Sequence, residues 1–403
     1  MKTAIIYGAG ALLVLLAGSC NHPDNKAPRA LSPGNLTASC LSFAQRPDGQ
    51  IYATWAETDS NQENLRLCFA AWNDKADSFA HWATIPLEQQ TSLNQENNPK
   101  MIFKNRDSAW LIYVVHVPTA ENKYASFIQY RVSGNAGKTW SAPYRFLRDS
   151  TAGQSLSYVS TARLPSGRLA FCWLGDGLSQ SRKGRPLYYA EANGVNHFSK
   201  PVLLDSFACP CCRNSIALSP GGKVSVVYRS LRQDSVRDIA FVCRSSGDSL
   251  FSKPVVFSGD HWVIDGCPED GPSVVASDSL NAVVWFTGSE NDKGVHFALL
   301  DNMGRVTVKR TIASLSHFIQ MASIDQNHHL VVYNKYVQDG GNSTGSPIIL
   351  QDMERPLDRG IVLTAKGAFA GYPVIAVQIE NGKVFVAWLD HQRAWYRVMM
   401  GVQ

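Results

Sequence analysis

Seven segments of the chain repeat one pattern, in which an alternating strand, a tight turn and a second strand follow one another. The clear copies span residues 40–55, 158–173, 215–228 and 373–388, and the weaker ones span 99–115, 272–286 and 318–333. Period-2 alternation with β-branched and aromatic residues marks these segments as β-hairpins. The turns recur at intervals of about 50–60 residues, which is the spacing of propeller blades. The repeat therefore predicts an all-β fold, a β-propeller of four-stranded blades in which each of these hairpins is followed by a second one.

The second hairpins carry a turn motif that is clearest at Ser133-Gly134-Asn135-Ala136-Gly137-Lys138-Thr139-Trp140. This stretch resembles the Asp-box, or BNR repeat, of the sialidase superfamily, with Asn135 in place of the aspartate, and weaker copies lie at 193–201 and 245–254. The resemblance implies a sialidase-like propeller. The enzymes of that family have six blades, whereas the hairpin count here favours seven, with six as the alternative.

The composition allows a large folded domain and argues against nucleic acid as a partner. Hydrophobic residues make up 45% of the 403 residues and charged residues 18%, so a sizeable core is available. Lysine and arginine total 38 against 33 acidic residues, a net charge of +5 that is spread along the chain without a basic run.

The N-terminus has the pattern of an export signal. Lys2 is followed by an apolar run from Ala4 to Ala17, too short for a membrane span and typical of a signal peptide. Leu16-Ala17-Gly18-Ser19-Cys20 resembles a bacterial lipoprotein signal, which implies that Cys20 is lipidated; an ordinary cleaved signal peptide is the alternative. We predict a signal peptide at 1–20, a tether at 21–35 and the propeller at 36–403.

These features predict an exported protein of the cell envelope. The lipid anchor would hold it on a bacterial membrane, which we expect to be the outer membrane, with the propeller facing the periplasm or the cell surface. Disulfides persist in such compartments, so pairing is the default for the remaining cysteines that lie close together.

One face of the predicted propeller gathers the polar residues. In up-and-down blades the first strand starts and the second strand ends on the same face, near the central axis. The turns of the Asp-box type lie on the opposite face and are structural. A funnel lined by cations, tyrosine and carboxylates suits an anionic, sugar-sized ligand, and we predict no cofactor and no separate metal site.

The sialidase resemblance implies roles for several residues of this face. Tyr372 matches the tyrosine nucleophile, and Arg229 matches the second of three arginines that grip a substrate carboxylate. Arg213 stands where the family has a glutamate, and it joins Arg237 as a supporting substrate-binding residue. The acid/base would be Asp238 or Asp270. The position of the first arginine holds Ser39, and no arginine stands at the third, so the catalytic set departs from the family pattern.

A closer resemblance is to bacterial propellers that are described as exo-α-sialidase or BNR-repeat proteins. It rests on Cys209-Pro210-Cys211-Cys212, Tyr228-Arg229, Arg237-Asp238-Ile239 and Cys267-Pro268-Glu269-Asp270-Gly271-Pro272, which cover two adjacent blades.

Four cysteines, Cys209, Cys211, Cys212 and Cys267, are expected to meet at the mouth of neighbouring blades. In an oxidising compartment they favour a disulfide that joins one of the cluster to Cys267. The alternative is a soft-metal site for Cu(I) or Zn(II), although Cys-x-Cys-Cys lacks the usual zinc spacing.

Three hypotheses for function follow. The first is a sialidase-like glycoside hydrolase. The second is a non-catalytic propeller with a degenerate active site, which binds a glycan or a protein. The third is metal or redox chemistry at the cysteines.

Overall fold

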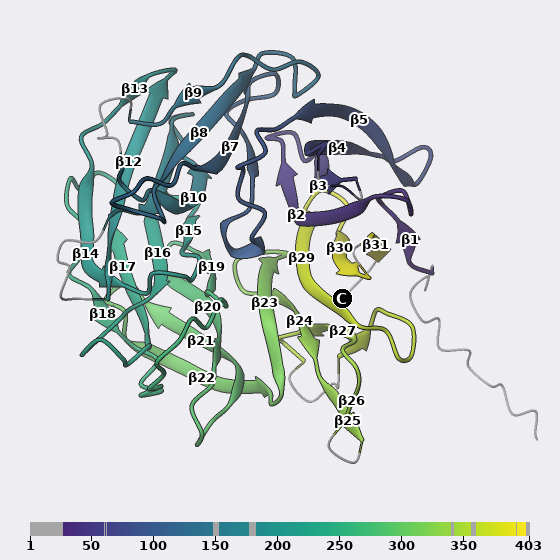
Figure 1. Cartoon of the computed structure of the whole chain (residues 1–403). Coiled ribbons are helices and arrows are strands. Elements are labelled where there is room, and N and C mark those ends of the chain that lie inside the picture. Colours follow the sequence, from purple (N-terminus) through teal and green to yellow (C-terminus); the bar gives the residue numbers. More distant parts are fainter. Residues whose placement is uncertain are drawn as a thin grey trace, which may run out of the picture.

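The computed structural model describes residues 27–59, 61, 63–147, 153–176, 183–339, 342–355, 360–391 and 393–399. These residues form a propeller of seven antiparallel blades around a central axis (Figure 1), which confirms the all-β prediction and the count of seven over six. Each predicted hairpin is the inner pair of one blade. Among the described residues, no helix is long and apolar enough to cross a membrane.

The strands follow one another from the axis outward in each of the first four blades. Blade I contains β2 (Thr37–Gln45), β3 (Ile51–Thr58), β4 (Arg66–Asn73) and β5 (Ser78–Pro86), and blade II contains β6 (Lys100–Phe103), β7 (Ala109–His116), β8 (Ser126–Ser133) and β9 (Tyr144–Arg145). Blade III contains β10 (Ser157–Arg163), β11 (Leu169–Leu174), β12 (Arg185–Gly194) and β13 (His197–Phe198), with β14 (Val202–Ala208) also paired to β12. Blade IV contains β15 (Ser215–Leu218), β16 (Val224–Arg229), β17 (Ile239–Arg244) and β18 (Val255–Val256).

The last three blades complete the ring. Blade V contains β19 (Ser273–Ala276), β20 (Leu280–Thr287), β21 (Gly294–Asp301) and β22 (Val306–Ala313). Blade VI contains β23 (Ser316–Ser323), β24 (His329–Lys335), β27 (Ile348–Asp352) and β28 (Ile361–Val362), with a ribbon of β25 (Val337–Asp339) and β26 (Asn342–Gly345) inserted. Blade VII contains β29 (Ala370–Gln378), β30 (Lys383–Asp390), β31 (Arg393–Met399) and β1 (Arg29–Ala30).

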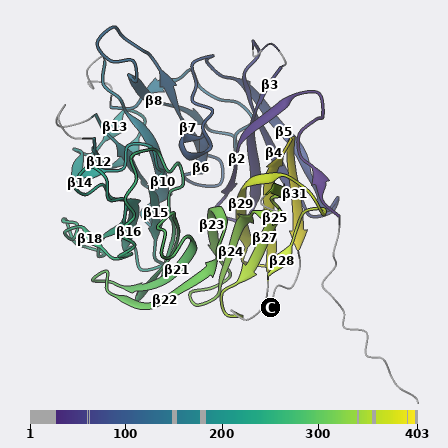
Figure 2. The same ribbon diagram turned by 60° about the horizontal axis from the view of Figure 1, so that its bottom comes forward.

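Blade VII is built from both ends of the described chain. Arg29 and Ala30 pair with Tyr396 and Trp395, so β1 is the outer strand next to β31. Figure 2 shows the N-terminal strand, in purple, beside the yellow C-terminal strands. β1 lies inside the segment 21–35 that the sequence predicts as a tether, so part of that segment belongs to a blade.

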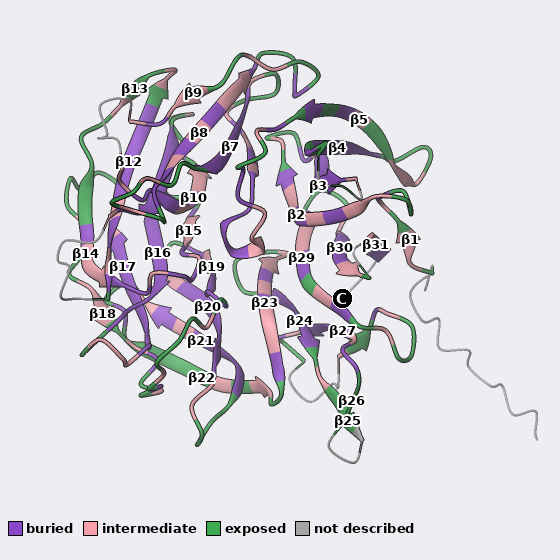
Figure 3. Ribbon diagram, in the orientation of Figure 1, coloured by how far each residue is buried: buried purple, intermediate pink, exposed green. Residues whose placement is uncertain are grey.

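In blades I to VI the second strand is the most buried, because it has a neighbouring strand on both sides and a neighbouring blade on each face (Figure 3). Every residue of β3, β11 and β16 is buried. Tryptophans on the second strands, including Trp110, Trp173, Trp285 and Trp388, are among the largest fully buried side chains. Apolar burial between blades is the main stabilising contribution to such a fold.

Four innermost strands share a bulge near the axis. Cys40, Tyr158, Phe318 and Tyr372 have φ values of 53°, 53°, 52° and 52°, and the pairing register skips at each of them. A positive φ is uncommon for residues other than glycine, and a bulge turns a side chain out of the regular alternation. The bulges therefore place equivalent side chains of blades I, III, VI and VII around the axis, near the start of each innermost strand.

Candidate functional site

A short polar segment between blades I and II lies at the central axis and contacts blades on both sides of it. It contains the 3-10 helix η1 (Gln95–Asn97), whose first turn is capped by the Asn94 side chain, which accepts from the Glu96 N–H at 2.7 Å. Gln95 reaches blade I, where its Nε2 donates to the Leu41 carbonyl at 2.7 Å and its Oε1 accepts from the Leu41 N–H at 3.0 Å. We call residues 94–98 the axial plug.

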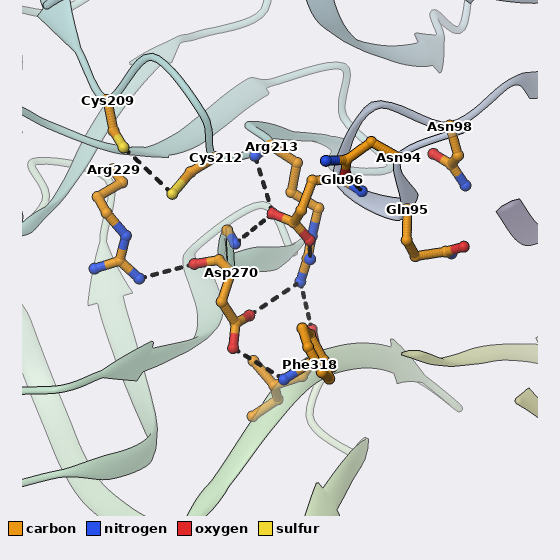
Figure 4. A network of polar contacts seen from close by, with 12 residues as sticks. Asn94, Gln95, Glu96, Asn98, Cys209, Cys212, Arg213, Arg229, Asp270 and Phe318 are labelled. Atoms are coloured by element: carbon orange, nitrogen blue, oxygen red, sulfur yellow. Dashed lines mark hydrogen bonds and ion pairs between the residues drawn. The ribbon is translucent and has the colours of Figure 1, made fainter. Parts of the chain in front are cut away.

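Glu96 carries the plug across the axis to blades IV and V (Figure 4). Its Oε2 accepts from the Arg213 N–H at 3.1 Å and from the Gly271 N–H at 2.7 Å, and its Oε1 pairs with the Arg213 guanidinium. A Cβ at Gly271 would lie 2.2 Å from the Arg213 carbonyl oxygen, so only glycine allows this approach. Glu96 is 2% exposed. The ion pair is thus almost entirely removed from water.

Asp270 extends the network to blade VI. Its Oδ2 accepts from the Phe318 N–H at 2.9 Å, and its Oδ1 lies 4.0 Å from the Arg213 guanidinium, which also donates to the Ile319 carbonyl at 2.7 Å. Burial raises the pKa of Asp270 to about 7, although the nearby Arg213 cation opposes the rise. Burial likewise raises the pKa of Glu96. The network holds two carboxyl groups whose charged forms are disfavoured by their surroundings.

A cavity of about 330 Å³ lies at the axis, lined by the innermost strands. Lys100 faces it, and its Nζ donates to the Asn98 Oδ1 at 2.7 Å. Burial lowers the pKa of Lys100 to about 8, against the opposing effect of Glu96.

Two of the arginines predicted to bind substrate, Arg229 and Arg213, bind groups of the protein itself. Arg229 is 1% exposed, and its two terminal nitrogens donate to the carbonyls of Arg237, Asp270 and Phe286 at 2.7–2.9 Å. Arg213 is held by Glu96, as described above. In this structure both guanidinium groups connect blades.

Arg237 and Asp238 lie beside Arg229 at the start of the third strand of blade IV. Arg237 is buried, and its Nη1 donates to the Cys209 sulfur at 3.0 Å. Asp238 is also buried and accepts from the Trp262 N–H at 3.2 Å, and burial raises its pKa.

Tyr372 lies on the innermost strand of blade VII, next to Phe318. It is 37% exposed, and its ring centroid lies 4.1 Å from that of Phe318. Partial burial raises the pKa of its hydroxyl, with Glu269 adding to the rise. This direction is opposite to the one that would activate a phenol as a nucleophile.

Three of the four clustered cysteines meet. The sulfurs of Cys209, Cys211 and Cys212 all lie within 4.8 Å of one another and are buried, and Figure 4 shows the contact between Cys209 and Cys212. Cys267 is exposed, and every described cysteine is a free thiol, so no disulfide to Cys267 is present. Burial acts to raise the pKa of Cys209, but the neighbouring thiols and the Arg237 cation lower it well below its ordinary value.

A larger cavity of about 610 Å³ opens on the loop face between blades II, III and IV. We call it the loop-face cavity. It is lined by His116, Asn122, Lys123, Tyr124, Tyr158, Asp176, Lys183, Pro210, Cys211, Cys267 and Glu269, together with part of the axial plug. Tyr124 is 69% exposed, and Lys123 lies 5.0 Å from its ring centroid. Aromatic, cationic and amide groups therefore share one concave surface.

Sequence reasoning missed Glu96 and the axial plug, although polar residues at 94–98 directly before Pro99 were a visible signal. Arg185, the first residue of β12, is a further residue of this region that the sequence did not single out. That arginine donates to the Gly175 and Leu174 carbonyls at 2.7 and 3.1 Å, so it stabilises the wall of the loop-face cavity.

Comparisons with known proteins show a shared fold. No family model matches the chain, and no curated protein matches it. A leech intramolecular trans-sialidase has a TM-score of 0.53 at 9% identity over 94% of this chain and 70% of its own. The polysaccharide lyase Uly1 has a TM-score of 0.52 at 11% identity over 90% of each chain. A Hadza microbial sialidase, Hz136, has a TM-score of 0.51 at 9% identity over 91% of this chain and 66% of its own. At these identities the likeness extends to the propeller architecture alone, which this chain shares with sialidases and a polysaccharide lyase.

Proposed function

We propose that the protein is a non-catalytic, glycan-binding propeller of the cell envelope, with an anionic sugar as its ligand. The observation that carries the proposal is the loop-face cavity. At about 610 Å³ it has the size of a small-ligand site. The exposed ring of Tyr124 offers a face for the apolar side of a sugar, and Lys123 offers positive charge to a carboxylate or sulfate. Lys183 pairs with Asp265 at 2.7 Å, but both side chains are largely exposed, so this ion pair is weak and Lys183 can exchange Asp265 for an anionic group of the sugar.

Binding is favoured over hydrolysis because the predicted catalytic groups are engaged elsewhere. Arg229 and Arg213 are held by carbonyls and by Glu96, and Asp270 is fully buried. A hydrolase of the sialidase type needs its arginines and its acid/base open to the sugar. The similar folds named as sialidase, trans-sialidase and polysaccharide lyase support a glycan as the ligand class.

Glycan binding is tested by titrating the purified protein with sialylated and uronate-containing oligosaccharides and with neutral oligosaccharides of the same length. We expect binding of an anionic set that weakens as salt is added. Tyr124→Ala should weaken it about fivefold, because a stacked ring contributes on the order of 1 kcal/mol. Lys183→Ala should weaken it and reduce its salt dependence. Leu250→Ala is the matched control, since Leu250 is 76% exposed and lies in a third-to-fourth-strand turn. Equal affinity of wild type and Tyr124→Ala would contradict the assignment.

The same preparations test catalysis directly. We expect no release of sugar from a fluorogenic sialoside. Turnover by the wild type that Tyr372→Phe abolishes would replace the binding function with the hydrolase.

The proposed location in the cell envelope depends on lipidation of Cys20, a residue that lies outside the described part of the chain. We expect Cys20→Ala to lose incorporation of labelled fatty acid and to move the protein from the membrane fraction to the soluble fraction. Cys267→Ser is the control, since Cys267 is an exposed thiol within the fold. An unlabelled wild-type protein would favour an ordinary signal peptide.

A further inference from the structure

We infer that Cys209, Cys211 and Cys212 form a three-coordinate thiolate site for a soft monovalent metal ion, with Cu(I) as the fitting ion. The inference does not rest on the proposed glycan function, although Cys211 also lines the loop-face cavity. It rests on the arrangement of the sulfurs, on the charge around them and on their access to the surface.

The spacing of the sulfurs fits a metal triangle. The Cys209 sulfur lies 3.3 Å from that of Cys212 and 3.7 Å from that of Cys211, and all three lie within 4.8 Å of one another. Metal–thiolate bonds of about 2.3 Å place three sulfurs at the corners of a triangle with edges of about 4 Å. Small movements of the side chains would bring the three sulfurs to that size.

The number of ligands favours Cu(I) over Zn(II). Structural zinc takes four ligands in a tetrahedron. Among the residues that the structure describes, no fourth Cys, His, Asp or Glu ligand atom joins the three sulfurs within 4.8 Å. Soft thiolates select Cu(I), and a d¹⁰ monovalent ion is satisfied by three of them.

The surroundings compensate the charge that such a site would carry. Three thiolates and one Cu(I) have a net charge of about −2 once the three thiol protons have left. The buried Arg237 guanidinium donates to the Cys209 sulfur at 3.0 Å. Arg229 lies near Cys209 and Cys212 (Figure 4) and is also buried. Two buried cations beside three buried sulfurs are the arrangement that an anionic metal–thiolate centre requires.

An entry path leads from the surface to the cluster. Cys211 and Pro210 form part of the wall of the loop-face cavity, and the exposed Cys267 lines the same cavity. An ion that enters the cavity therefore finds one exposed thiol, Cys267, and one member of the buried cluster, Cys211, in its wall. A disulfide between Cys209 and Cys212 is the competing state of the same residues.

The test uses the full mature chain, purified under reducing, oxygen-free conditions and loaded with Cu(I) from a weak chelator. We expect one equivalent of copper per chain, sulfur-only coordination by X-ray absorption, and retention against a competing Cu(I) chelator. Cys209→Ser, Cys211→Ser and Cys212→Ser should each weaken retention by at least tenfold, and Arg237→Met, which removes an outer-shell donor, by about 10–100-fold. Zn(II) alone should bind more weakly.

Two matched controls separate the site from general thiol binding. Cys267→Ser and Cys172→Ser, which change an exposed and a strand-buried thiol, should keep one equivalent of copper. Thermal unfolding of every variant shows that loss of copper is not loss of fold. Failure of the reduced protein to retain Cu(I), or equal retention by the cluster variants, would overturn the assignment. So would a complete Cys209–Cys212 disulfide, found by peptide mapping, in metal-free protein isolated from the membrane.

Discussion

Replacing Glu96 by alanine should lower the free energy of unfolding by about 3–5 kcal/mol, the range measured when one partner of a buried ion pair is removed. The change removes the closest counter-charge of the Arg213 guanidinium and leaves only Asp270, at 4.0 Å, beside it. It also leaves the N–H groups of Arg213 and Gly271 without an acceptor. Buried polar groups that lose their partners carry the full desolvation cost. Chemical denaturation monitored by tryptophan fluorescence gives the measurement.

The matched control is Glu121→Ala, which removes an exposed carboxylate from a loop of blade II and should change stability by less than about 0.5 kcal/mol. The double variant Glu96→Ala/Arg213→Ala should be more stable than the sum of the single effects implies, since it also removes the stranded cation. A small loss for Glu96→Ala together with additive effects would show that the axial plug does not join the blades energetically.

The carboxyl group of Asp270 should make the protein less stable as the pH rises from about 4 to about 7. Its pKa in the folded protein is about 7, against 3.8 as its ordinary value. The unfolded chain releases this proton near pH 4, whereas the folded chain keeps it, so the folded state binds more protons in that interval. The contribution of Asp270 to the free energy of unfolding is therefore largest below about pH 4, falls as the pH rises, and levels off above about pH 7. The total is on the order of 4 kcal/mol.

Asp270→Asn isolates this effect, because the amide oxygen keeps the acceptor for the Phe318 N–H and carries no titrating proton. The stability difference between wild type and variant should change by about 1.4 kcal/mol per pH unit at most between pH 4 and 7. Asp278→Asn, at an exposed carboxylate whose pKa is lowered by hydrogen bonds, should show the opposite slope at lower pH. Parallel stability curves for wild type and Asp270→Asn would rule out a raised pKa.

The blades could be predicted because their signals are local. A strand alternates over a few residues, and a glycine at a turn such as Gly167 or Gly222 takes a positive φ, 77° and 89° here. Such patterns repeat with every blade, so seven hairpins could be counted directly from the sequence. The extra strand β1 was missed because two residues in a polar segment carry no alternation.

The interior of the axis could not be predicted in the same way, since its contacts join residues far apart in the chain. Glu96 and Arg213 are separated by 117 positions, and no local pattern relates them. A polar residue at a strand end looks the same whether it faces a ligand or another blade. Arg229 was therefore predicted to bind substrate, whereas three carbonyls occupy its guanidinium group.

The pairing of β1 with β31 determines when the propeller can close during synthesis. The ribosome makes β1 near the start of synthesis and the other three strands of blade VII at its end, so an emerging chain presents an open sheet edge until Trp395 and Tyr396 have been made. Non-local contacts of this kind slow folding and lengthen exposure to aggregation and proteolysis. A chain truncated before β31 therefore cannot close the propeller, because β1 then has no strand to pair with.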